Sequence, residues 1–254
     1  MALRDKGLAE STVRNVFAVL SQALDVAVRD RLIARNPAAA VKRPRVAATE
    51  AVHLDVAQVG DLLSAAKGMR YVDALRLIAA TGLRRGEALG LSWTDIDLDD
   101  SVIRVRHTVA SVDGKLSLSG VKTAKSKRTV PLSPATVAML RGRRPALLRE
   151  RLAAGDQYTE NNLVFPTELG TLVDPRNLLR EVETAAARCG FEGVGVHTLR
   201  HSAAVAWLEA GVHIRAVADL LGHSSVSITG DVYGHTSEPV SRSAVEGLSD
   251  ALGF

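Results

Sequence analysis

The sequence predicts an α+β fold that is mainly α-helical and contains one small antiparallel β-sheet. Most of the chain carries apolar residues at three- and four-residue steps, which is typical of helices packed on a core. Residues 101–131 depart from this pattern, because apolar and basic side chains alternate there around a turn expected at Asp113-Gly114. The 254 residues suffice for one large domain or for a domain with a smaller module.

The first part of the chain is expected to form helices followed by a linker or loop. Residues 8–34 predict two helical segments, with Ser11 as a candidate N-cap and an end at Asn36-Pro37. Residues 38–53 are short of large apolar side chains and carry three basic ones. This segment is interpreted either as a linker that crosses something negative or as a solvated loop.

Helices are expected again on both sides of the sheet. Before it, one helix begins after the candidate N-cap Asp55 and a second covers residues 70–80, which Gly82 is expected to end. After residue 131 everything is expected to be helical. The boundaries are indicated by two N-cap and proline pairs and by two glycines: Ser133-Pro134, Asp174-Pro175, Gly190 and Gly211.

Composition limits the classes of function. Lys and Arg total 32 against 28 Asp and Glu, and the pI near 9.4 fits a nucleic-acid partner without requiring one. The single cysteine, Cys189, excludes an intrachain disulfide and a cysteine-based metal site. The opening residues lack the apolar run of a signal peptide, and no stretch approaches the roughly 20 apolar residues of a membrane span.

Six side chains in short motifs suit phosphodiester exchange without a metal. That reaction needs guanidiniums on the non-bridging oxygens, an in-line nucleophile and an acid for the leaving oxygen. The chain shows neither an obvious acidic cluster for Mg²⁺ nor a GxxxxGK[ST] phosphate loop. The candidates are Arg84 in TGLRRGE, Lys122 in VKTAKSKRTVPL, His197 and Arg200 in HTLR, His223 in LLGHSS and Tyr233 in DVYGH.

Each candidate also has an ordinary structural explanation. Arg84 could cap a surface helix, Lys122 could lie in a solvated basic turn, and Tyr233 could be a half-buried packing residue. His197 and His223 could be structural histidines, the latter bonded to the last carbonyls of a helix. The order and phrasing of the motifs together favour the chemical interpretation.

The HTLR motif carries a further structural expectation. His197 and Arg200 are three residues apart, so on a helix they share one face. The following residues can bury that helix against a core and hold the pair rigidly; they are Ala203, Ala206, Trp207 and Ala210.

From about His53 to its C-terminus the sequence resembles the tyrosine recombinase, or phage integrase, family. TGLRRGE, HTLRHS, LLGHSS and VYGH stand in the order of that family, and DLDDSVIRV and VFPTELG resemble its connecting phrases. The resemblance implies the family's catalytic domain over residues 47–254. It also implies a site-specific recombinase or integrase of a phage or other mobile element, which breaks and rejoins DNA through a 3′-phosphotyrosyl intermediate.

The resemblance assigns roles to individual residues. Arg84 and Arg200 match the two arginines that bind the scissile phosphate, and Tyr233 matches the nucleophile. His197 matches the histidine that hydrogen-bonds the phosphate and assists with the tyrosine's proton, and His223 matches the second histidine.

Two further positions follow from the same resemblance. Lys122 matches the lysine on the sheet turn, which is the acid for the 5′-oxygen. Lys125 and Lys127 compete for that role, because the turn is one residue longer than is usual. Glu87 matches an acidic position that supports the arginines.

The resemblance also implies partners and conditions. The covalent link stores the phosphodiester energy, so no cofactor, ATP or metal is expected. The expected partner is double-stranded DNA, and a homotetramer is expected to hold two DNA sites together. The expected location is the cytoplasm, at the nucleoid. Accessory DNA-bending or directionality proteins are possible further partners. A last helix, over about residues 238–252, either docks on a neighbouring protomer or packs on its own domain.

The N-terminal part departs from the family pattern. Residues 1–46 resemble only the last two helices of the helical, SAM-like core-binding domain, with its linker, and are expected to be truncated. This keeps open a mobile-element relic that binds DNA without productive recombination. A type IB topoisomerase-like relaxing enzyme, which shares the chemistry, is the third hypothesis.

Overall fold

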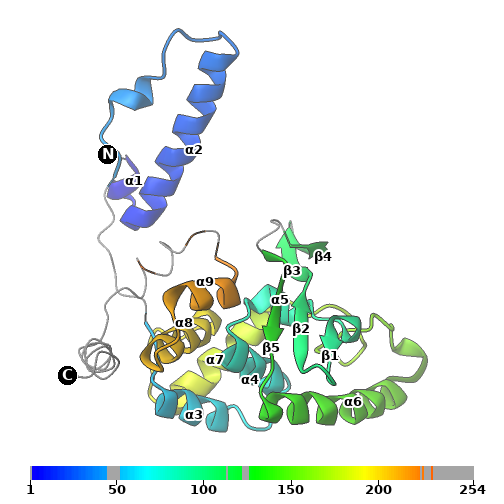
Figure 1. Cartoon of the computed structure of the whole chain (residues 1–254). Helices are drawn as coiled ribbons and strands as arrows, with labels where there is room; N and C mark the ends of the chain where they lie inside the picture. The colour runs from blue at the N-terminus through cyan, green and yellow to red at the C-terminus, as the bar shows by residue number, and fades with distance from the viewer. Residues whose placement is uncertain are drawn as a thin grey trace, which may run out of the picture. The chain divides into compact units, whose positions relative to one another are not determined.

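The chain divides into two compact units, residues 1–50 and residues 51–254, and each is described by itself. Figure 1 shows their helices and strands. The computed structural model describes residues 2–44, 52–112, 114–121, 126–223, 225 and 230.

The first unit is helical. α1 (Ala2–Asp5) is a single turn, and α2 (Glu10–Arg29) is one continuous helix instead of the two expected segments. Its N-cap is Ala9, so Ser11 lies inside the first turn and does not cap the helix. None of the residues of α2 is buried, so its apolar stripe is not covered within the described part of this unit.

A short 3-10 helix, η1 (Pro37–Ala40), is fastened to α2 by one side chain. The Asn36 carboxamide accepts a hydrogen bond from the backbone N–H of Ala38 and so caps η1. Its amide nitrogen donates to Asp25 Oδ1 at 2.6 Å, on α2. The chain reversal at Asn36-Pro37 therefore depends on a side chain that bonds both elements.

The second unit consists of helices around two small sheets, and its helix boundaries follow the expected capping residues. The side chains of Asp55, Ser133 and Asp174 each accept a hydrogen bond from a backbone N–H in the first turn of the helix that follows. These N-caps are thereby confirmed. The helices are α3 (Val56–Ala65), α4 (Val72–Thr81), α5 (Arg85–Leu89), α6 (Pro134–Ala154), α7 (Pro175–Arg188), α8 (Val196–Glu209) and α9 (Ile214–Leu221), with 3-10 turns η2 (Trp93–Asp95) and η4 (Gly155–Gln157).

One stretch after residue 131 is not helical, contrary to the expectation. Residues 158–174 form an irregular segment between η4 and α7. It bonds within itself, for example from the N–H of Thr159 to the carbonyl of Leu169, and also to the preceding part of the chain: the N–H of Val164 donates to the carbonyl of Leu91, and the N–H of Trp93 donates to the carbonyl of Asn162. The buried Val164 and Phe165 then pack into the core from this segment. The last helix, expected over residues 238–252, lies outside the described residues.

The expected sheet region forms two small antiparallel sheets. β1 (Ile96–Asp97), β2 (Val102–Val105) and β5 (Arg128–Pro131) pair in the order β1-β2-β5. β3 (His107–Val112) and β4 (Lys115–Gly120) pair only with each other, around the turn expected at residues 113–114. Arg106 separates β2 from β3, and its carbonyl accepts from the N–H of Val121, so the chain changes sheet at that residue.

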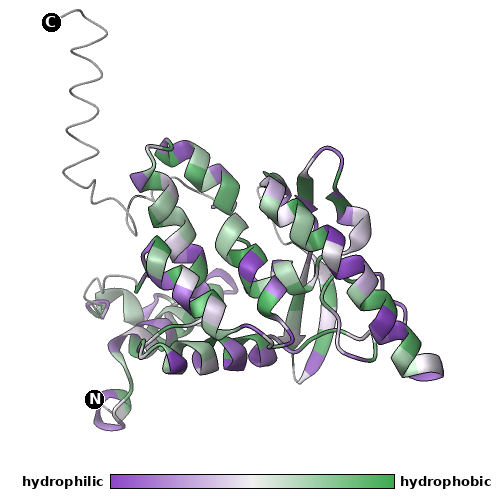
Figure 2. Cartoon of the chain, turned by 90° about the horizontal axis from the view of Figure 1, so that it is seen from below, coloured by the Kyte–Doolittle hydropathy of each residue, from purple (hydrophilic) through white to green (hydrophobic). Residues whose placement is uncertain are grey.

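The core of the second unit surrounds α4. Leu75, Leu77 and Ile78 of this helix are fully buried, and Ile103 of β2 and Leu199 of α8 join the same cluster. Each such side chain contributes about 1.5–3 kcal/mol when it leaves water. Figure 2 shows apolar and polar residues mixed along the helices, as expected when one stripe faces the core. Among the described residues, no helix has the length and apolar character that crossing a membrane requires.

Candidate active site

Arg84 stands at a sharp turn between two helices. Gly82 ends α4 in the left-handed conformation (φ 62°), and an added Cβ there would lie 2.8 Å from the Leu221 side chain. Arg84 then caps α5: its backbone N–H donates to Glu87 Oε2 at 2.9 Å, and its Nη1 donates to Glu87 Oε1 at 2.8 Å. The turn therefore fixes both the backbone and the guanidinium of Arg84.

Glu87 is bound by a second arginine, Arg128, from the start of β5. Arg128 Nη1 donates to Glu87 Oε1 at 3.1 Å, and Nη2 donates to Oε2 at 2.8 Å, so the pair is bidentate. The side chains of Glu87 and Arg128 are only 3% and 6% exposed. Burial alone would raise the pKa of Glu87, but the hydrogen bonds and charge of Arg128, helped by Arg84, lower it below its usual value. The carboxylate is therefore ionised at neutral pH.

Arg200 joins the HTLR motif to the TGLRRGE turn. It lies on α8, is 4% exposed, and donates from Nη1 to the carbonyl of Gly82 at 2.5 Å. Its Nη2 donates to the carbonyl of Leu221 at 2.8 Å. A buried guanidinium is thus held between the end of α4 and the end of α9, which pack on α8 (Figure 1).

Arginine side chains from three elements donate hydrogen bonds to backbone carbonyls at the end of α9. Arg128 Nε donates to the carbonyl of Leu220 at 2.7 Å, Arg200 Nη2 donates to that of Leu221, and Arg84 Nη2 donates to that of Gly222 at 3.1 Å. These carbonyls lack partners inside their helix and carry the negative end of its dipole. Three consecutive peptide groups therefore position three guanidiniums, directly before His223.

The histidines around this cluster all have lowered pKa values. For His223, burial and then the charges of Arg200 and Arg84 lower the pKa from 6.5 to about 4. For His197, partial burial and then the charge of Arg200 act in the same direction. His201, whose ring centroid lies 6.3 Å from that of His197, is shifted downward by burial and then by His197. These imidazoles are therefore neutral at neutral pH.

The structure brings four predicted site residues into one region and leaves two undescribed. Arg84, His197, Arg200 and His223 come together through α5, α8 and the end of α9. The predicted nucleophile Tyr233 and the predicted acid Lys122 lie outside the described residues, as does its competitor Lys125. The other competitor, Lys127, is described and exposed, one residue before β5.

The expectation for the HTLR helix holds in part. His197 and Arg200 do lie on one helix, α8, but Arg200 is buried while His197 is exposed. Of the residues expected to bury it, Ala203 is buried, whereas Ala210 is exposed. The partly buried Trp207 packs on a small cluster with α9, so α8 is held between the core and α9.

Sequence reasoning missed Arg128 and His201. A signal for Arg128 was available: strand residues two apart share a face, and Val130 of KRTVPL is buried. A basic residue on the buried face of a strand needs an acidic partner. His201 stands in HTLRHS four residues after His197, which puts both on neighbouring turns of α8.

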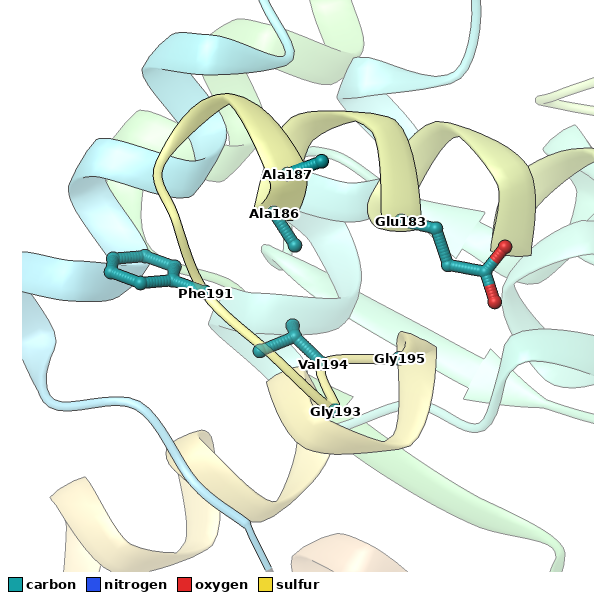
Figure 3. Close-up of a pocket in the computed structure, with 7 residues that line it drawn as sticks. All are labelled: Glu183, Ala186, Ala187, Phe191, Gly193, Val194 and Gly195. Atoms are coloured by element: carbon teal, nitrogen blue, oxygen red, sulfur yellow. The ribbon is translucent and has the colours of Figure 1, made fainter.

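A pocket elsewhere in this unit has a different character. It lies where the chain passes from α7 to α8 (Figure 3). Glu183 is the only charged residue among those lining it, and none of the predicted site residues takes part. This pocket offers no cation for a phosphate. Its lining residues are Glu183, Ala186, Ala187, Phe191, Gly193, Val194 and Gly195.

Comparison with known proteins gives consistent results. The family model described as "Phage integrase family" matches residues 53–239. A tyrosine recombinase XerC-like protein of Caldanaerobacter subterraneus subsp. tengcongensis is 32% identical, over 98% of this chain and 68% of that protein. The ICEBs1 integrase of Bacillus subtilis is 25% identical, also over 98% of this chain and 68% of its own length.

Solved structures agree on the fold. The Tn1549 transposon integrase in complex with a circular intermediate DNA gives a TM-score of 0.80 at 22% identity, covering 97% of this chain and 82% of that one. The XerA recombinase gives a TM-score of 0.59 at 26% identity, covering 78% of this chain and 66% of that one. The chain therefore belongs to the phage integrase family, the tyrosine recombinases, which break and rejoin DNA by site-specific recombination.

Proposed function

We propose that this chain cuts and rejoins duplex DNA with Tyr233 as the nucleophile and with Arg84 and Arg200 as ligands of the scissile phosphate. The observation that carries this proposal is the convergence of these two arginines on the last turn of α9. Solved relatives described as integrases in complex with DNA support duplex DNA as the substrate.

The geometry suits a phosphate that gains charge in its transition state. Arg84 is 37% exposed, and its two bonds from Nη1 and Nη2 leave further N–H groups of the five in a guanidinium. Arg200 is held rigidly behind it by two backbone carbonyls. Donors fixed in advance in a site of low dielectric stabilise developing charge without reorganising during the reaction.

The neutral histidines suit hydrogen bonding and proton transfer. With its pKa lowered to about 4, His223 adds no positive charge at neutral pH and can donate from one ring nitrogen while accepting at the other. We assign His223 to the phosphate oxygens. We assign His197 to a hydrogen bond with the phosphate and to the proton that Tyr233 gives up, since its pKa is also lowered.

The proposed reaction balances within the protein and DNA. The Tyr233 phenolic oxygen forms a bond to phosphorus, and the bond from phosphorus to the 5′-oxygen breaks. Lys122 gives a proton to that oxygen, so the strand leaves as a 5′-hydroxyl. In the second step a 5′-hydroxyl attacks the phosphotyrosine and gives its proton to Lys122, while Tyr233 leaves and regains its proton from His197. The number of phosphodiester bonds is unchanged, so we propose that neither ATP nor a metal takes part.

We further propose that residues 1–46 act as a helical DNA-binding module and that 47–254 form the catalytic domain. The division of the chain after residue 50 supports a boundary in this region. Recombination joins two sites, so we propose a homotetramer on DNA as the working assembly, located at the nucleoid.

A covalent trapping assay tests the proposal. The purified chain is incubated in EDTA with a pool of nicked suicide duplexes of randomised sequence, and the products are separated on a denaturing gel. We expect a DNA-shifted protein band for the wild type and none for Tyr233→Phe, which lacks only the hydroxyl and should bind duplex normally.

The outcomes separate the competing functions. A band that persists in Tyr233→Phe shows that another residue is the nucleophile. Measurable duplex binding without any band favours a DNA-binding relic. Relaxation of a supercoiled plasmid without any paired site favours the topoisomerase-like activity.

A further inference from the structure

We propose that Arg128 is a positioning residue for strand cleavage: it takes up the negative charge of Glu87 and so leaves the positive charge of Arg84 to the phosphate. This inference rests on the proposed role of Arg84. Arg128 would not touch the DNA itself, since its side chain is 6% exposed.

The contacts show which arginine binds Glu87 more completely. Arg128 places one nitrogen on each carboxylate oxygen, at 3.1 and 2.8 Å. The Arg84 side chain has a single bond to that carboxylate, at 2.8 Å. A bidentate pair is stronger and more tightly oriented than a single bond. Glu87 is therefore chiefly the partner of Arg128, and Arg84 is bound more loosely on the solvent side.

The formal charges of Arg84, Glu87 and Arg128 show how Arg128 would affect phosphate binding. Arg84 and Glu87 alone would sum to zero, and a neutral pair attracts a phosphate weakly. With Arg128 the three side chains carry one net positive charge. Because Glu87 and Arg128 are buried, these charges interact through a medium of lower dielectric than water. This net positive charge can act on a phosphate in solvent through Arg84, because the Arg84 side chain is partly exposed.

Arg128 also fixes the position of Arg84 through α9. Its Nε donates to the carbonyl of Leu220, two residues before Gly222, whose carbonyl accepts from Arg84. Gly222 has φ 66°, and a Cβ there would lie 2.9 Å from Arg128 Nη1, so the helix end packs directly on this guanidinium. Loss of Arg128 would therefore weaken both contacts of the Arg84 side chain, the one to Glu87 and the one to the carbonyl of Gly222.

The same unit contains a second Arg–Glu–Arg cluster that serves as a matched control. Glu150 of α6 accepts from Arg143 at 2.7 Å and from Arg70 at 2.8 Å. The Arg143 side chain is 9% exposed, close to the value for Arg128. No predicted site residue takes part, so substitution there tests the effect of losing a buried arginine as such.

The experiment measures single-turnover covalent attachment to the pool of nicked random duplexes, in EDTA, at a temperature where every variant is folded. We expect Arg128→Met to slow attachment by up to about 10²-fold, the scale of losing one transition-state donor, because Arg84 would then be paired with Glu87 instead of the phosphate. Arg128→Lys keeps the charge but loses the bidentate contact and the Nε bond, so it should recover part of the rate. Adding Glu87→Gln to Arg128→Met should raise the rate by about tenfold over Arg128→Met alone, a coupling typical of residues in contact.

Three results in the variants of this cluster would overturn the inference. They are a wild-type rate for Arg128→Met, equal losses for the Met and Lys variants, or no recovery when Glu87→Gln is added. Arg143→Met, alone and with Glu150→Gln, should change the melting temperature without this pattern of rates. If Arg143→Met slows attachment as much as Arg128→Met does, a general effect of losing buried arginines replaces the proposed one.

The salt dependence of duplex binding distinguishes failure of this inference from failure of the proposed function. If Arg84→Met attaches DNA as fast as the wild type, the assignment of Arg84 fails first. If the wild type attaches no DNA, binding of the same pool still decides the inference. The slope of log affinity against log salt should become shallower by about 0.9 in Arg128→Met, the value for one phosphate contact, and should return in the double variant. An unchanged slope overturns the inference.

Discussion

The guanidinium of Arg200 donates a hydrogen bond to the carbonyl oxygen of Gly82, a residue 118 positions earlier in the chain. This bond ties the HTLR motif on α8 to the turn that carries Arg84. Its second bond, to the carbonyl of Leu221, ties the same guanidinium to the end of α9. Arg200 is therefore part of the scaffold of the site as well as a proposed phosphate ligand.

This double role predicts different outcomes for the two arginines. Arg200→Ala should slow covalent attachment by at least ~10²-fold, because one transition-state donor is lost. It should also destabilise the fold, since each buried carbonyl left without a donor costs about 1–3 kcal/mol. Arg84→Ala should slow attachment comparably with a smaller loss of stability, because Arg84 is 37% exposed. Single-turnover rates and denaturant unfolding measure both effects.

Two different results would contradict these predictions. Attachment by Arg200→Ala at nearly the wild-type rate would remove this residue from the chemistry. Equal losses of unfolding free energy in the two variants would show that the carbonyls of Gly82 and Leu221 do not depend on Arg200.

Gly222 offers a test of the packing between α9 and Arg128. It has φ 66°, and an added Cβ would lie 2.9 Å from Arg128 Nη1. Gly211 has φ 80°, and nothing lies within 4 Å of the same position. Gly211→Ala should therefore cost only the left-handed strain, about 1–2 kcal/mol. Gly222→Ala should cost more in chemical denaturation and should also slow attachment, because Arg128 must move. Equal costs would mean that the contact with Arg128 relaxes freely.

Local signals in the sequence determined much of this architecture. Asp55, Ser133 and Asp174 cap helices as expected, because capping depends on one side chain and the next few peptide groups. The N-cap expected at Ser11 was wrong, because the helix begins after Ala9, two residues earlier, without any side-chain cap. The irregular segment 158–174 was missed because its position depends in part on hydrogen bonds to residues far away in the chain, such as the bond from Val164 to Leu91.

The same holds for the site: its residues could be recognised from short motifs, but the contacts between distant elements could not. The motifs named Arg84, His197, Arg200 and His223, because a phosphate-binding set of residue types can be recognised from its order. The resemblance indicated that Glu87 supports the arginines, but not that Arg128 would share this carboxylate with Arg84. That depends on β5 and α5 meeting in space, which spacing along the chain does not encode.

The proposal that Lys122 protonates the leaving 5′-oxygen can be tested chemically. A duplex in which sulfur replaces that bridging oxygen has a leaving group that needs no acid. Lys122→Ala should attach the oxygen substrate slowly, by about 10²–10⁴-fold less than the wild type, and the sulfur substrate at nearly the wild-type rate. Lys125→Ala and the exposed Lys127→Ala should show no such rescue. Rescue of either of these would move the assignment to that residue.

The histidines predict how stability depends on pH. Burial and then the charges of Arg200, Arg84 and Arg128 lower the pKa of His223 from 6.5 to about 4, with a further contribution from His201. Between these values the unfolded chain binds a proton at His223 and the folded chain does not, so stability rises with pH across the window and falls on acidification.

The measurement is the melting temperature from pH 7 down to about pH 5.5, which stays above the ordinary pKa of Glu87 and therefore above the window in which that carboxylate, with its lowered pKa, affects stability. The wild type should lose stability steadily, whereas His223→Gln should lose less over the same interval. The slope should not vanish in that variant, because His197 and His201 also have lowered pKa values. An identical slope in His223→Gln would mean that folding does not lower the pKa of His223, and the assignment of a buried, neutral imidazole at this position would fail.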